Sequence, residues 1–307
     1  MLITLGAVLG KHSLSQLWVL ATLEIVFYTF NEAFCVLKLG ANDIGGSMFI
    51  HSFGAYFGLA ATYFFSYKKA IEDVRGRCEG DYTSQLVAMV GTIFLFMFWP
   101  SFNGALAADF AQQRVVFNTV LSITSSCISA CAISRLFLQR LDMEVVLNAT
   151  LAGGVAIGTS ADIIISPGTS MIVGALAGIL SAVGFLKMSA FFKREINLHD
   201  TCGVHNLHGM PGVLGGIVGA VTASMSDASF TSEEYLQSTF PKLEEGRTTA
   251  EQGWYQMAAL GVTLGISLIS GAISGFIASK CGSVEHLFDD KEHFAHANYE
   301  IEVIEHD

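Results

Sequence analysis

The pattern that decides the fold occurs twice, as Asp43-Ile-Gly-Gly46-Ser-Met-Phe-Ile-His51 and as Asp200-Thr-Cys-Gly203-Val-His205-Asn206-Leu-His208. Each copy has an aspartate, a glycine three residues later and a histidine eight residues later, and a glycine-rich apolar run follows. A histidine inside a membrane span is costly and marks a path for a polar molecule. The repeat therefore indicates two half-chains that each place one histidine inside a membrane.

The composition agrees with a membrane protein. Of the 307 residues, 52% are hydrophobic and only 14% are charged, whereas a soluble domain has about 25% charged residues. The net charge of −11 argues against binding of nucleic acid, which requires a basic stripe. The bilayer, rather than nucleic acid or a soluble core, is the expected environment of this chain.

Eight apolar stretches are long enough to cross a bilayer, which takes about 20 residues per helix. They lie near residues 15–37, 44–67, 84–107, 114–138, 144–166, 168–192, 202–225 and 254–280. Strands of a membrane barrel are shorter and alternate in polarity. The sequence therefore predicts an all-α fold, a polytopic membrane helix bundle over residues 1–281 followed by an acidic tail over residues 282–307.

The basic residues predict how the chain is oriented. Alternate connections carry 12 of the 16 Lys and Arg residues, and the other side carries Lys38, Arg114, Lys242 and Arg247. Because cytoplasmic loops are enriched in Lys and Arg, we expect the C-terminal tail to be cytoplasmic and the loop near residues 226–253 to be external.

The two repeated histidines suit the handling of a small polar molecule. In an inverted repeat, His51 and His208 enter from opposite faces and meet near the midplane. Neutral imidazoles each have one donor and one acceptor nitrogen, so a pair offers hydrogen bonds to a small neutral molecule. The alternative for either histidine alone is a core residue bonded to a neighbouring carbonyl.

Asp43 and Asp200 precede their histidines by eight residues, about 12 Å of helix. A carboxylate at a helix start accepts bonds from free amides and favours the positive end of the helix dipole. We expect this structural role for both aspartates, with direct binding of a cation as the alternative.

Four segments in order resemble the ammonium transporter and Rhesus (Rh) glycoprotein family, in particular its Rh branch. They are the segment from Gly45 to Gly58, Phe98-Trp-Pro-Ser-Phe-Asn103, the segment from Asn148 to Gly158, and the segment from Asp200 to Gly212. The resemblance covers nearly the whole chain and implies an ammonium-transporter-like inverted repeat. It also implies a homotrimer or an Rh-type heteromer in the plasma membrane, with a narrow apolar pore in each subunit.

The resemblance assigns expected roles to individual residues. Ammonium loses its proton at a vestibule, and ammonia then passes His51 and His208. Phe102 resembles a gate phenylalanine, and Asn206 resembles a polar residue of the inner pore. Glu32 resembles an outer-vestibule carboxylate that attracts ammonium, and Asp142 resembles a carboxylate on the cytoplasmic side.

The chain departs from the family pattern in two places. Gln85 stands where some Rh proteins carry a vestibule carboxylate, so recruitment of cations is expected to be weaker. The family has eleven or twelve spans, of which about eight are present, and the missing N-terminal helices would carry the partner of Phe102. We therefore expect a fragment, an incomplete gene prediction or a truncated isoform.

Three functions fit these residues to different degrees. The first is an ammonium or ammonia channel, through whose apolar pore carbon dioxide would also fit. The second is a non-conducting structural subunit of a membrane complex, against which the presence of both histidines counts. The third is an intramembrane metalloenzyme using His205 and His208, which no HExxH or cysteine cluster supports. We therefore expect no enzymatic activity, no metal and no cofactor.

Overall fold

The computed structural model describes residues 1–65, 78–164, 166–228, 232–282, 284 and 287–289. Within these ranges every regular element is a helix, so the predicted all-α fold is confirmed. Seven helices of the described part of the chain are long and apolar enough to cross a membrane: Leu14–Leu39, Tyr82–Gly104, Phe110–Leu138, Met143–Ser160, Pro167–Glu195, His205–Ser224 and Thr249–Ala278.

The described residues form the following elements in chain order. The α-helices are α1 (Leu2–Val8), α2 (Leu14–Phe34), α3 (Phe53–Thr62), α5 (Tyr82–Gly104), α6 (Asp109–Leu138), α7 (Met143–Ile157), α8 (Pro167–Val183), α9 (Ser189–Glu195), α10 (Met210–Ser224), α11 (Glu233–Thr239) and α12 (Thr249–Ala278). π-Helical turns extend four of the long helices: Cys35–Leu39 after α2, η2 (Ser47–Ser52) before α3, Gly184–Met188 after α8 and η6 (His205–Gly209) before α10.

The remaining predicted span, near residues 44–67, is helical but is not among these seven. It consists of η2 and α3 and ends in a 3₁₀ turn over Tyr63–Phe65. The segment that follows, 66–77, lies outside the described residues, as does most of the tail predicted over residues 282–307.

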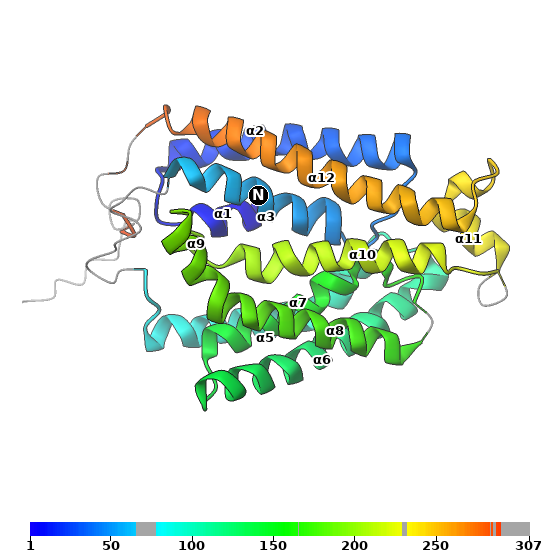
Figure 1. The fold of residues 1–307 in the computed structure, drawn as a ribbon, viewed down its shortest axis with the longest axis horizontal. Coiled ribbons are helices and arrows are strands. Elements are labelled where there is room, and N and C mark those ends of the chain that lie inside the picture. Colours follow the sequence, from blue (N-terminus) through cyan, green and yellow to red (C-terminus); the bar gives the residue numbers. More distant parts are fainter. Residues whose placement is uncertain (66–77, 165, 229–231, 283, 285–286, 290–307) are drawn as a thin grey trace, which may run out of the picture.

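Two groups of helices make up the bundle (Figure 1). In one group α6 packs against α7 and α8, and in the other α12 packs against α3, α2 and α10. Small residues allow the close approach of backbones that membrane helices use. A Cβ atom on Gly174 of α8, for example, would lie 2.0 Å from the Ser122 carbonyl oxygen of α6.

The helices run nearly parallel to the long axis, so their connections gather at two ends (Figure 1). One end carries α9 and the end of α12, and the opposite end carries α11. The helices that begin with η2 and η6 start from opposite ends, as an inverted repeat requires. This arrangement brings the first turns of both helices toward the centre of the bundle, where η2 contacts η6.

Candidate functional site

Each of the two central helices begins with a glycine in the left-handed region. Gly46 has φ of +73° and Gly203 has φ of +68°, a conformation that glycine adopts without steric cost. At Gly203 a Cβ atom would also lie only 2.3 Å from the Phe185 ring. These two glycines allow the chain to turn sharply into η2 and η6.

The two repeated aspartates cap these turns. One oxygen of Asp43 accepts bonds from the backbone N–H groups of Met48 and Phe49, at 2.9 and 2.7 Å. The carboxylate of Asp200 accepts bonds from the N–H groups of Val204 and His205, at 3.0 and 2.9 Å. Each carboxylate thus satisfies two donors that the start of a helix leaves free.

His51 and His208 meet edge to edge, with parallel ring planes, at the centre of the bundle. Their Nδ1 atoms are 3.1 Å apart, and their ring planes differ by 4° with centroids 5.1 Å apart. One Nδ1 therefore donates to the other. The Nε2 atom of His51 is buried and has no hydrogen-bond partner among the described residues.

Aromatic side chains from α5 surround His51. The indole of Trp99 stacks on the imidazole with centroids 5.6 Å apart, and the Phe102 ring lies 5.8 Å from the same imidazole. Trp99 was not singled out from the sequence. Its position one helical turn before Phe102 was the signal that it shares a face with that residue.

A cavity of about 650 Å³ opens on this side of the histidine pair. His51, His208, Trp99 and Phe102 line it together with apolar side chains that include Leu95 and Phe98. The cavity therefore offers a small molecule an apolar surface whose polar atoms include those of the two imidazoles.

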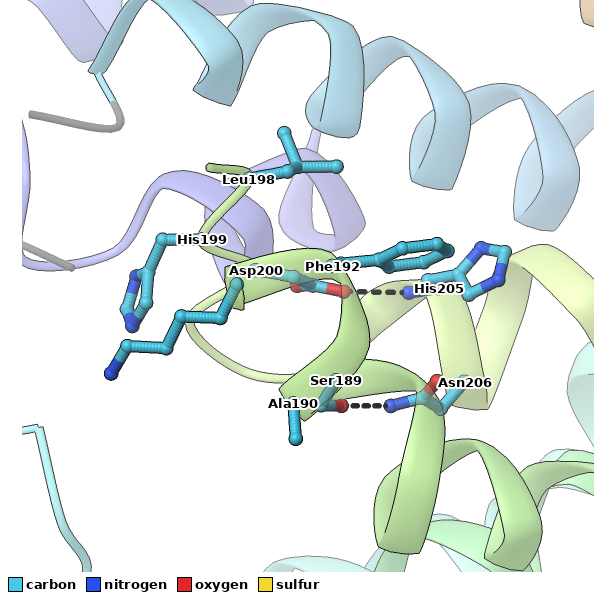
Figure 2. A pocket seen from close by; sticks show the side chains of 9 residues that line it. Ser189, Ala190, Phe192, Leu198, His199, Asp200, His205 and Asn206 are labelled. Carbon is cyan, nitrogen blue, oxygen red and sulfur yellow. Dashed lines mark hydrogen bonds between the residues drawn. The ribbon is translucent and has the colours of Figure 1, made fainter. Parts of the chain in front are cut away.

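A second cavity, of about 170 Å³, lies toward the end of the bundle that carries α9 (Figure 2). Asp200, His205 and Asn206 line it with residues of α9 and the α9–η6 connection. The Asn206 amide donates to the Ser189 hydroxyl at 2.7 Å. Asn206, which the sequence predicted as a residue of the inner pore, thus lines the smaller cavity, whereas His51 lines the larger one.

Glu32 and Asp142 lie apart from the paired histidines. Glu32 is half-buried in α2 and does not line the 650 Å³ cavity. Asp142 is the N-cap of α7, where its carboxylate accepts a bond from the N–H of Val145 at 3.1 Å. Capping of α7 accounts for the position of the Asp142 carboxylate. Neither Glu32 nor Asp142 lies in the central site.

Comparison with known proteins gives the family. The chain matches the ammonium transporter family over residues 1–297. It belongs to this family. Ammonium transporter Rh type B of Oryzias latipes is 46% identical over 280 residues, which are 90% of this chain and 60% of that protein. Ammonium transporter Rh type B of Mus musculus is 45% identical over 283 residues, with 61% of its length covered.

A solved structure of Nitrosomonas europaea Rh50, described as one of the Rhesus family of channels, superposes with a TM-score of 0.79. It is 31% identical, and the match covers 97% of this chain and 72% of that one. The expected resemblance to the Rh branch is thereby confirmed. The chain spans about three fifths of the length of the curated ammonium transporters that it matches.

In this member of the ammonium transporter family, the rings of His205 and His208 do not point toward a shared site. The His208 ring faces His51, whereas the His205 ring lies against Tyr56 and Phe192. Among the described residues no group of three or more His, Cys, Asp or Glu side chains could hold a metal ion. The geometry therefore offers no ligand set to the metalloenzyme alternative.

Proposed function

We propose that this chain forms the pore of an Rh-type ammonium transporter that passes neutral ammonia. The observation that carries the proposal is the hydrogen-bonded pair of parallel imidazoles, His51 and His208, in an apolar cavity. The names of the Rh type B relatives support the choice of ammonium as the molecule recruited.

The pair has hydrogen-bonding capacity left for a substrate. The bond between the Nδ1 atoms uses one donor and one acceptor, and the buried Nε2 of His51 has no protein partner in the described part of the chain. A neutral imidazole has one nitrogen that donates a hydrogen bond and one that accepts it. It can therefore bind either the lone pair or an N–H group of ammonia. Hydrogen bonds to the imidazole rings then offset the free-energy cost of moving ammonia out of water.

The same site disfavours ions. Moving an isolated charge into an apolar environment costs far more than moving a neutral polar group. The cavity walls beside His51 are contributed by residues such as Leu95, Phe98 and Phe102. We infer that ammonium gives up its proton before this point and that Phe102 helps to close the pore to water.

The wider arrangement is part of the proposal. Glu32 and Asp142 attract ammonium at the two mouths, and Asn206 lines the inner pore. The subunit assembles as a homotrimer or Rh-type heteromer in the plasma membrane. The excess of Lys and Arg on the side of α9 and the tail supports a cytoplasmic C-terminus.

The test is an ammonium-jump recording of intracellular pH in cells that express the complete protein. Wild type should speed the alkalinisation that follows addition of ammonium. The His51→Ala variant should alter this rate several-fold at equal surface expression, because it removes the bond to His208 and the free Nε2. Leu95→Ile, which conserves an apolar wall, serves as the matched control and should conduct as wild type.

Two results would contradict the proposal. A wild-type protein that reaches the surface without changing the rate would favour the non-conducting structural subunit. Unchanged flux in both His51→Ala and His208→Ala would remove the histidine pair from the mechanism. The same cells exposed to a step in carbon dioxide would show whether that gas also passes.

A further inference from the structure

An apolar groove of about 540 Å³ lies between α3, α12 and the segment that contains α9. Neither imidazole of the central pair lines it. Its walls include Leu59, Ala60, Tyr63, Phe64, Ile196 and Leu268. Of these side chains, Tyr63 is 63% exposed and Leu268 is 46% exposed. The groove is therefore open to the outside of the subunit and offers an apolar molecule a concave surface.

Two rows of side chains give the groove its direction. Ala60 and Phe64 lie four residues apart along α3 and its last turn, and Leu268 and Ala272 lie four residues apart on α12. Each pair therefore shares one face of its helix. The row on α12 continues to Phe276, whose ring contacts the Phe64 ring with centroids 5.9 Å apart. The groove thus follows α12 toward the end of that helix.

The length of this row matches the depth of one leaflet of a bilayer. The twelve residues from Leu268 to Lys280 extend over about 18 Å at 1.5 Å per residue. This length is just over half of a hydrocarbon core about 30 Å thick. Since α12 ends at Ala278, a molecule in the groove would extend from the membrane surface toward the middle of the bilayer.

Positive charge lies at the surface end of the groove. The Lys280 ammonium is 5.4 Å from the centroid of the Phe276 ring, and the side chain is exposed. Among the described residues it forms no ion pair. Lys193 and Arg194 lie in the last turn of α9 at the same end of the bundle (Figure 1). Arg194 is paired with Glu195 at 2.5 Å, so Lys280 is available to an anion.

We propose that this groove binds one acyl chain of an anionic phospholipid, with the headgroup beside Lys280. The apolar walls suit the hydrocarbon chain, and the ammonium group attracts the anionic headgroup, because basic residues at a membrane surface favour anionic lipids. The bound chain fills the space between α3, α9 and α12 and holds α9 against the two longer helices. This lipid site goes beyond transport and does not depend on the proposed function.

The test measures binding of phospholipids to the purified protein by native mass spectrometry. Phosphatidylserine and phosphatidylcholine with the same acyl chains are compared, and wild type should retain more phosphatidylserine. Lys280→Gln should weaken binding of phosphatidylserine about fivefold, the ratio that corresponds to one basic residue at an anionic membrane surface. Arg140→Gln is the matched control, because it removes an exposed charge from the connection between α6 and α7, and should bind as wild type.

A second pair of variants tests the groove itself. Ala272→Phe adds a ring to the wall of the groove and should lower the retention of both phospholipids. Ile273→Phe adds the same ring at the next position, which is 47% exposed and does not line the groove, and should retain both as wild type. A structure of wild type in nanodiscs that contain phosphatidylserine and cholesterol should show acyl-chain density between α3 and α12.

Three results would overturn the inference. They are equal retention of the two phospholipids by wild type, unchanged retention of phosphatidylserine by Lys280→Gln, and a groove that holds a sterol, a detergent or a helix of another chain. Because lipid binding is measured without transport, each of these results would leave the proposed function intact. An absence of ammonia flux in a wild-type protein that binds the lipid would overturn the proposed function alone.

Discussion

Asp43 and Asp200 show how single residues hold the central site in place. Each carboxylate accepts two backbone N–H groups at the start of a helix that carries one of the paired histidines. The bonds fix where η2 and η6 begin and thereby where His51 and His208 meet. A role as cation ligand would compete with these bonds.

The Asp43→Ala variant should be destabilised by about 3 kcal/mol, because two buried N–H groups would lose their acceptor at about 1–3 kcal/mol each. Thermal unfolding of the purified protein in detergent measures the effect. Asp43→Asn retains one acceptor oxygen and should lose less. Asp81 caps the exposed start of α5, so Asp81→Ala should lose least; an equal loss in all three variants would contradict the capping role.

At the scale of elements, the connection between α7 and α8 holds a buried carboxylate. Asp162 is 4% exposed and accepts one bond of 3.4 Å from the Asn42 amide, while its Oδ1 has no partner among the described residues. Its backbone oxygen accepts bonds from Arg114 and from the Tyr235 hydroxyl, at 2.9 and 2.6 Å. The connection is therefore held to both α6 and α11.

Burial raises the pKa of the Asp162 carboxyl from its ordinary value of 3.8 to about 6. A raised pKa in the folded protein means that folding favours the protonated acid. The stability it contributes is complete below pH 3.8 and is lost as the pH rises through about 6.

Asp162→Asn, which cannot ionise, should therefore raise the melting temperature at pH 7.5 and change it much less at pH 5. Thermal unfolding at the two pH values checks the prediction. The control is Glu245→Gln, because the Glu245 side chain is 64% exposed and its charge is solvated. A gain for Asp162→Asn that is the same at both pH values would show that ionisation is not the cause.

At the scale of the whole molecule, the two ends of the bundle differ in the number of Lys and Arg residues. Lys11, counted from the sequence among the basic residues of one side, is fully buried and donates to the Ala7 carbonyl and the Thr62 hydroxyl at 2.8 and 2.5 Å. It therefore serves as an internal brace between α1 and α3. The remaining basic residues of that side still outnumber those of the side of α11.

The proposed orientation predicts which thiols are accessible. Cys281 is exposed at the end of α12, and Glu245 lies in the connection that precedes α12 at the opposite end. In a background without other cysteines, a membrane-impermeant maleimide should label Glu245→Cys in intact cells. A protein retaining only Cys281 should be labelled after permeabilisation alone, and the reverse pattern would invert the proposed topology.

Much of this architecture follows from local sequence. Seven of the eight predicted spans match helices that are long and apolar enough to cross a membrane, because hydropathy is a property of neighbouring residues and the backbone in lipid must satisfy its own hydrogen bonds. The eighth predicted span, near residues 44–67, is helical from Ser47 to Phe65 but is not among these seven. Its histidine was nevertheless visible, because the spacing from Asp43 to His51 repeats between Asp200 and His208.

Only the tertiary structure decided which side chains meet. His51 and His208 are 157 residues apart, and the Trp99 ring that stacks on His51 comes from a third helix. Helical periodicity does not tell which face of a span meets lipid and which meets a neighbour. His205 shows the consequence, since its spacing from His208 suggested one shared centre, whereas packing against Phe192 and Tyr56 directs it to a separate cavity.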